Sequence, residues 1–149
     1  MSEHRVQVNW ERGGVDFGYE SYPRDHFWTF EGGVRVPASA APAFRGNPER
    51  VDPEAAFVAA LSSCHMLTFL AIASRKRLVV DGYEDEAVGL LEKNEAGRLA
   101  MTRVVLRPRV LFAGPTPAPD VVADLHERAH RECFIANSVL TRVEVEARS

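Results

Sequence analysis

Runs in which apolar and polar residues alternate predict β-strands along much of the chain. The runs are Val6–Trp10, Phe17–Tyr22, Phe27–Val36 and Val139–Val145. The longer stretch Val79–Phe112 predicts a hairpin with its turn at Glu92–Gly97. Its second arm places apolar residues on one face and arginines on the other, which is typical of a half-exposed antiparallel strand: Val104, Leu106, Val110 and Phe112 against Arg103, Arg107 and Arg109.

Two segments have helical character. Asp52 is suited to cap a helix over Pro53–Ser74, since proline fits the first helical position and Glu54 favours the positive end of the helix dipole. This helix is apolar nearly all round, so we expect burial on most sides and a second copy of the chain to cover what one copy leaves open. Apolar residues at helical spacing predict the second helix over Asp120–Cys133. The sum is a single α+β domain, residues 1–149, with antiparallel sheets around a long buried central helix.

Composition narrows the function classes. Hydrophobic residues make up 46% and charged residues 26%, as in ordinary globular domains. The net charge of −3 gives no electrostatic support for a nucleic-acid or membrane-surface partner. Residues 1–10 have no apolar core of a signal peptide, so we expect a cytoplasmic protein. Ala55–Ser74 is long enough for a membrane span, but its five polar residues favour a core helix.

Two cysteines, Cys64 and Cys133, are the candidate chemistry. They can be small core residues, because free cysteine is often buried. With His65 and His130 they also form the ligand types of a tetrahedral zinc site, although adjacent helix positions such as Cys64 and His65 point about 100° apart. The third interpretation is a redox pair: one thiolate is oxidised to a sulfenic acid, and the other cysteine condenses with it to a disulfide.

A redox pair needs a lowered thiol pKa, which a nearby arginine supplies, and two Cα atoms within about 7 Å. Arg45 lies in the irregular segment Ser39–Val51, just before the first helix, and Glu54 is on the same helix as Cys64. A carboxylate holds a guanidinium in a bidentate pair, so these residues are candidates to activate the thiol.

These residues form motifs that resemble those of the OsmC/Ohr family of osmotically inducible and organic hydroperoxide resistance proteins. The stretch Pro53–His65 resembles the family's Pro-Glu-x-x-x-x-Ala-Ala-x-x-x-Cys helix, and Ala129–Ser138 resembles its second cysteine motif. The resemblance extends from about Arg35 onward. Phe134 replaces a common proline, and His65 replaces a common phenylalanine. These departures, together with an atypical Ser39–Val51 loop, point to a divergent OsmC-like subgroup.

The resemblance implies a peroxidase that reduces organic hydroperoxides to alcohols, built as an intertwined homodimer. Cys64 would be the peroxidatic cysteine and Cys133 the resolving one, and Glu54 would orient an activating arginine, Arg45 or alternatively Arg35. No bound cofactor or metal is implied, and an external dithiol, such as a dihydrolipoyl group, would reopen the disulfide. The alternative is a binding or redox-sensing module that kept the fold without peroxidase turnover.

The remaining candidates have simpler interpretations. We expect His4, His26 and His126 at the surface or at caps. Apolar residues near Cys64 would either pack in the core or line an entry for bulky peroxides: Phe57, Leu61, Met66 and Phe69.

Overall fold

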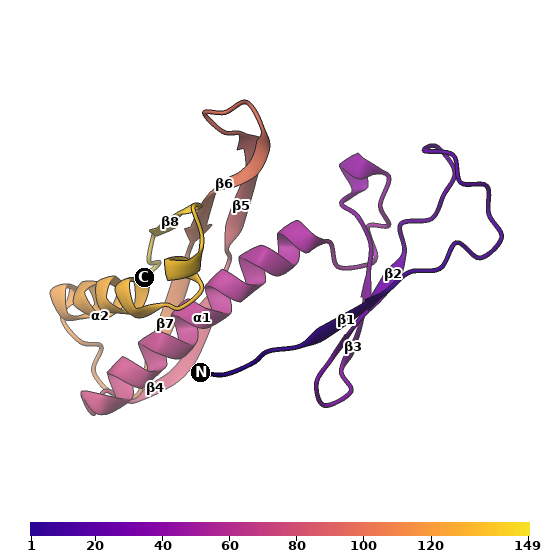
Figure 1. The fold of residues 1–149 in the computed structure, drawn as a ribbon. Coiled ribbons are helices and arrows are strands. Elements are labelled where there is room, and N and C mark those ends of the chain that lie inside the picture. The colour runs from indigo at the N-terminus through magenta and orange to yellow at the C-terminus, as the bar shows by residue number, and fades with distance from the viewer. The chain divides into compact units, whose positions relative to one another are not determined.

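The computed structural model describes residues 1–149, which divide into two compact units, Met1–Ala56 and Phe57–Ser149. That the chain is a single domain, as its length and composition predicted, stays a prediction. Helices and strands are mixed, with mostly antiparallel strands and one long helix, so the predicted α+β class is confirmed. Figure 1 shows the elements in chain order.

The first unit is built on a three-stranded antiparallel sheet, in the order β1 (Val6–Asn9), β2 (His26–Phe30) and β3 (Arg35–Ala38). Strands β2 and β3 form a hairpin through Gly32 and Gly33, both of which have positive φ. The segment after β3 is irregular, as expected, except for one 3-10 turn, η1 (Pro42–Phe44).

The strand predicted at Phe17–Tyr22 is wrong. These residues form a loop in which the amides of Ser21 and Tyr22 both donate to the carbonyl of Gly18. The aromatic spacing that resembled a strand serves a cluster instead. Phe17 packs against Trp10 and Tyr22, with ring centroids 6.0 and 5.1 Å away.

Helix α1 (Pro53–Arg75) has almost the predicted bounds. The Asp52 carboxylate accepts a hydrogen bond from the Ala55 amide at 2.8 Å, which is the predicted cap. The helix is less buried than predicted. One stripe, with members three to four residues apart, is buried within the second unit: Leu61, His65, Phe69, Ile72 and Ala73.

The predicted hairpin over Val79–Phe112 is two nested strand pairs. Strand β5 (Val88–Lys93) pairs with β6 (Leu99–Leu106), and outside them β4 (Val80–Asp85) pairs with β7 (Pro108–Phe112). The second arm of the predicted hairpin is therefore not one continuous strand, because β6 ends at Leu106 and β7 begins at Pro108. The last strand, β8 (Arg142–Val145), adds to β6 in parallel, so it departs from the otherwise antiparallel order.

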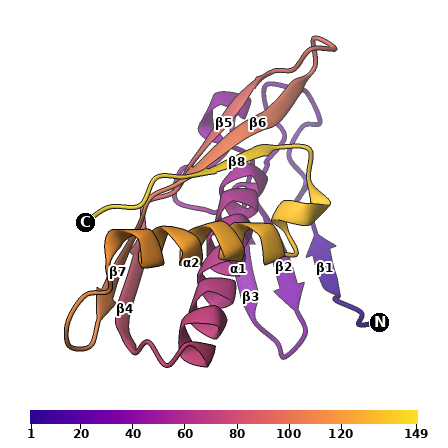
Figure 2. The ribbon, with the colours of Figure 1, turned by 90° about the vertical axis from the view of Figure 1, so that its left-hand side faces the viewer.

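Helix α2 (Pro119–Glu132) also matches its prediction and crosses α1 in Figure 2. The two helices share a hydrophobic cluster with β7: Phe69, Ile72, Ala73, Phe112, Leu125 and Ala129. A second cluster joins Leu61 of α1 to Val104 and Leu106 of β6. These clusters pack α1 against α2 and against one strand of each of the two sheets within residues 57–149.

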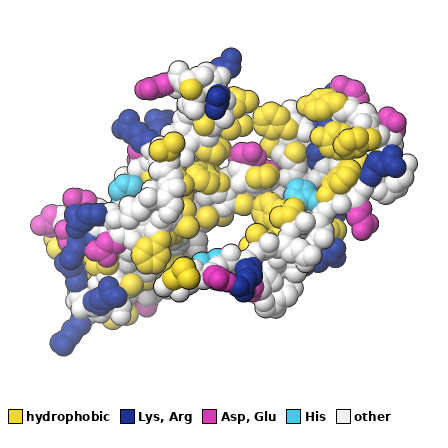
Figure 3. Space-filling view, viewed as in Figure 1, with side chains coloured by type: hydrophobic (Ala, Val, Ile, Leu, Met, Phe, Trp, Pro, Cys, Tyr) yellow, Lys and Arg dark blue, Asp and Glu magenta, His cyan; other side chains and the backbone are white.

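By length and composition alone, α1 is apolar enough to cross a membrane. Its buried stripe instead forms part of the hydrophobic core of an α+β unit, as the core helix of a folded domain does. Its other side carries exposed Ala59, Ser63, Leu67 and Ala71. Figure 3 shows hydrophobic side chains at the surface along this part of the molecule. Such a stripe of small and apolar residues is unusual for a surface that stays in water.

Gly46 is the glycine where a side chain fits least. A Cβ atom there would lie 1.5 Å from the carbonyl oxygen of Ala40, so the backbone would have to shift. We expect Gly46→Ala to lower the free energy of unfolding by about 1–3 kcal/mol, the range for overpacking that forces the backbone to shift. Urea unfolding measures this. Gly82→Ala, whose Cβ meets Leu111 at an ordinary 3.5 Å, is the control and should change stability by less than about 1 kcal/mol. Equal losses in both variants would contradict the argument.

Candidate functional site

Cys64 occupies the middle of α1 and is half-buried, so its thiol is open in part to solvent. The hydroxyl of Thr68, one turn later, donates to the Cys64 carbonyl at 2.8 Å. This bond holds the turn that carries the cysteine. A partly exposed thiol on a rigid helix has the access that a reaction with an external oxidant requires.

Cys133 is the residue at which α2 ends, and only 1% of it is exposed. Its Sγ accepts a hydrogen bond from the Ala136 amide at 3.4 Å. Burial, and secondly the neighbouring Cys64 side chain, raise the pKa of Cys133 to about 11. At neutral pH, Cys133 is therefore a protonated thiol and a poor first nucleophile.

The structure brings the two cysteines together, although they lie far apart in the chain. The Cys64 side chain lies near enough to the Cys133 thiol to help raise its pKa, and both thiols are free. This proximity follows from the packing of α1 on α2, because Phe69 of α1 and Ala129 of α2 share one core cluster. Two adjacent thiols of unequal exposure are the arrangement that a reversible disulfide needs.

Arg45 and Glu54 both belong to residues 1–56, and the structure does not pair them. Arg45 has positive φ at the end of η1, and its guanidinium forms an ion pair with Glu20, beside the Tyr19 ring. Glu54 stands in the first turn of α1. The alternative arginine, Arg35, lies over the Phe27 ring with its guanidinium carbon 3.5 Å from the centroid.

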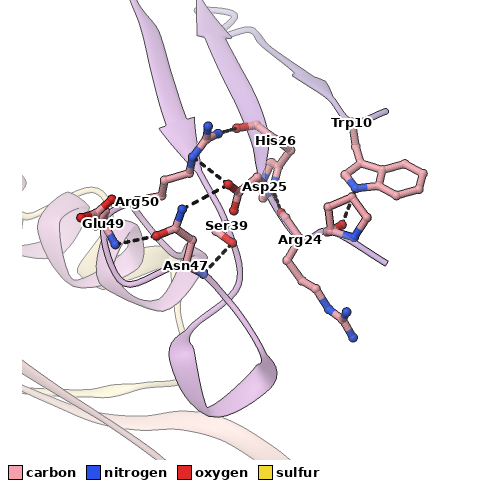
Figure 4. Close-up of polar contacts among 9 residues, drawn as sticks. Trp10, Arg24, Asp25, His26, Ser39, Asn47, Glu49 and Arg50 are labelled. Carbon is pink, nitrogen blue, oxygen red and sulfur yellow. Dashed lines mark hydrogen bonds and ion pairs between the residues drawn. The ribbon is translucent and has the colours of Figure 1, made fainter. Parts of the chain in front are cut away.

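The first unit holds another arginine more firmly, and sequence reasoning missed it. Arg50 pairs with the Asp25 carboxylate at 3.2 Å and donates to the His26 carbonyl at 3.1 Å. The side-chain amide of Asn47 also donates to the Asp25 carboxylate, and the backbone amide of Asn47 donates to the Ser39 hydroxyl (Figure 4). No local pattern signals this network, because its partners come from segments far apart in the sequence.

The expectation that His126 lies at the surface or at a cap is wrong: only 5% of it is exposed. Residues 122, 126, 129 and 133 recur at helical spacing, so the apolar stripe of α2 gave the signal. His126 meets His65, also buried, with His65 Nε2 and His126 Nδ1 3.0 Å apart. Burial is the main cause that lowers the pKa of each imidazole from 6.5 to about 4.

The geometry also bears on the zinc site and on the entry for bulky peroxides. No group of three or more His, Cys, Asp or Glu side chains is placed to hold a metal ion, so the zinc interpretation has no support. Leu61 and Phe69 are fully buried in the two core clusters and do not line an entry, whereas Phe57 and Met66 are half-buried.

Comparisons with known proteins identify the family of the chain. The model of the OsmC-like protein family matches residues 46–148, and the chain therefore belongs to the OsmC-like family. An OsmC-like protein of unknown function from Vibrio cholerae O1 is 47% identical, with a TM-score of 0.95 over 99% of this chain and 100% of that one. The resemblance inferred from the two cysteine motifs is confirmed.

More distant relatives share the fold. The organic hydroperoxide resistance protein OhrB of Bacillus subtilis is 18% identical, with a TM-score of 0.71 over 99% of this chain and 98% of that one. An organic hydroperoxide resistance protein from Elizabethkingia anophelis is also 18% identical, with a TM-score of 0.73 over 99% and 94%. The uncharacterized protein YmaD of Bacillus subtilis is 22% identical, over 98% of this chain and 93% of its own length.

Proposed function

We propose that the protein is a thiol-dependent peroxidase that reduces organic hydroperoxides. The observation that carries the proposal is the proximity of Cys64 to Cys133. The family includes organic hydroperoxide resistance proteins, which supports the same chemistry here. The unequal exposure of the two cysteines supports an order in which Cys64 is oxidised first and Cys133 resolves.

The reaction has three balanced steps. The Cys64 thiolate attacks the distal oxygen of the hydroperoxide, the O–O bond breaks, and the departing alkoxide takes a proton to become an alcohol. The Cys133 thiol then attacks the sulfenic sulfur, which forms the disulfide and releases water. An external dithiol, such as a dihydrolipoyl group, donates two electrons and two protons by exchange and restores both thiols.

Arg45 and Glu54 complete the proposal as the activating arginine and its orienting carboxylate, with Arg35 as the alternative arginine. In the structure Arg45 pairs with Glu20, so activation requires it to exchange that partner for Glu54. Both side chains of the existing ion pair are well exposed, and such pairs contribute about 1 kcal/mol or less to stability. Breaking this pair therefore costs little free energy.

A cytoplasmic homodimer is part of the same proposal. The exposed apolar stripe of α1 would be covered by a second copy of the chain, as the resemblance to the family implies. Light scattering on the purified protein should give a mass about twice the 16.5 kDa of one chain. A monomer at micromolar concentration would contradict the proposed covering of α1.

Peroxide consumption by the reduced protein tests the activity. We expect one equivalent of cumene hydroperoxide to remove both thiols, and hydrogen peroxide to react much more slowly. Stopped-flow mixing followed by thiol counting measures both. Two unreacted thiols after excess organic peroxide would contradict the peroxidase and favour a binding or redox-sensing module with the same fold.

A further inference from the structure

Two buried histidines join α1 to α2 next to the cysteines. His65 is 1% exposed and His126 is 5% exposed, and their ring planes differ by only 7°. The 3.0 Å contact between His65 Nε2 and His126 Nδ1 is the one buried hydrogen bond between nitrogen or oxygen atoms of the two helices' side chains. A directional bond of this kind fixes how one helix lies on the other, whereas apolar packing tolerates small slides.

The histidines are tied to the cysteines through both helices. His65 follows Cys64 directly on α1. His126 precedes Cys133 by two helical turns, so both lie on the face of α2 that meets α1. Any displacement of α2 along α1 that breaks the imidazole contact therefore also changes the separation of the two sulfur atoms.

We propose that His65 and His126 are positioning residues for disulfide formation: their hydrogen bond holds α1 and α2 where the sulfur atoms of Cys64 and Cys133 can join. The proposal rests on the proposed function for the use of that disulfide.

The surroundings of the pair keep both imidazoles neutral, so that one donates and the other accepts. On the α2 side His65 faces His126 and His130, and neither offers a negative charge. His126 faces Asp85 of β4. Asp85 is already engaged, because its oxygens accept hydrogen bonds from the Ser62 hydroxyl at 2.5 Å and from the Arg107 amide at 2.6 Å.

Plain packing is the competing explanation, since the His126 ring also lies 4.5 Å from that of Phe69. Asparagine and leucine have nearly the same shape, but only asparagine offers a polar atom near the position of Nδ1. His126→Asn should therefore keep the hydrogen bond to His65, and His126→Leu should lose it. A packing role predicts no difference between the two variants.

The test is the equilibrium between the Cys64–Cys133 disulfide and glutathione. Glutathione disulfide takes two electrons and two protons from the thiols and becomes two glutathione molecules. Alkylation and mass measurement give the oxidised fraction for each variant. We expect His126→Leu to lower the equilibrium constant for disulfide formation about tenfold, the effect of one lost buried hydrogen bond. His126→Asn should stay within about threefold of the unchanged protein.

Each outcome of this experiment either supports or overturns the positioning role of the two histidines. Equal constants for the two variants, or a leucine variant that matches the unchanged protein, would overturn the positioning role. If His126→Leu does not fold, His65→Gln and His65→Met form the equivalent pair on the other helix. No peroxide is used, so a disulfide that responds to the variants in a protein inert to peroxide would leave this proposal standing and overturn the peroxidase. A protein that never forms the disulfide would overturn both.

Discussion

Replacing Cys64 with serine should lower the rate of cumene hydroperoxide consumption by about 1,000-fold or more, the scale seen when a covalent nucleophile is removed. A serine hydroxyl is not ionised at neutral pH and does not form the sulfur–oxygen bond on which the reaction depends. The rest of the molecule should be unaffected, because Cys64 is half-buried and serine is only slightly smaller. Stopped-flow measurement with the reduced variant gives the rate.

Cys133→Ser is the matched control. Cys133 is buried, and its pKa is raised to about 11, so it does not begin the reaction. The variant should consume its first equivalent of peroxide at nearly the normal rate and stop at the Cys64 sulfenic acid, which a sulfenic-acid-specific reagent traps. Normal consumption by Cys64→Ser together with loss in Cys133→Ser would reverse the assigned roles.

Acid should destabilise the protein through the paired imidazoles. Both pKa values are lowered, mainly by burial, from 6.5 to about 4, so between these limits the unfolded chain binds protons that the folded chain does not. The free energy of unfolding that depends on these two histidines is therefore at its full value above pH 6.5. It falls as the pH drops from 6.5 toward 4. Each histidine contributes a slope of at most about 1.4 kcal/mol per pH unit in this window.

Urea unfolding at pH 7, 6 and 5 measures that slope. A double variant, His65→Gln with His126→Asn, keeps polar amides in place of both rings but does not titrate, so its stability should change less over the same range. His4→Gln, at an exposed position, should follow the unchanged protein. A double variant as acid-sensitive as the unchanged protein would show that other groups cause the loss.

Local signals predicted the two helices, whereas the pairing of their cysteines was implied only by the resemblance to the family. Asp52, Pro53 and Glu54 mark the start of α1 to the residue, and the spacing of Val122, Leu125 and Ala129 places Cys133 on the inner face of α2. These predictions succeeded because caps and helical periodicity depend on residues within a few positions of one another.

Predictions that depend on distant partners did not succeed as well. Alternation identifies strands but does not say which strand pairs with which, so nothing in the sequence of Val139–Val145 indicated that β8 would pair with β6 in parallel. The ion-pair partner of Arg45 could not be predicted for the same reason, since Glu20 lies in a loop that has no recognisable sequence pattern. His126 is different: its position on the helical stripe of α2 was visible, and only the general preference of histidine for the surface hid it.

The nesting of β5 and β6 inside β4 and β7 bears on how the second unit folds. Strands β5 and β6 are joined by the tight turn at Asn94–Gly97. Because closing so short a loop costs little conformational entropy, this pair is able to form early. Once it has closed, it brings the end of β4 near the start of β7, and the outer pair no longer has to search across the full intervening chain. Strand β8 can join in parallel only after β6 is in place, and the polypeptide between them contains α2. Because α2 follows β4–β7 in the chain, the two cysteines of a nascent chain stay separate thiols until α2 has been made and packs on α1.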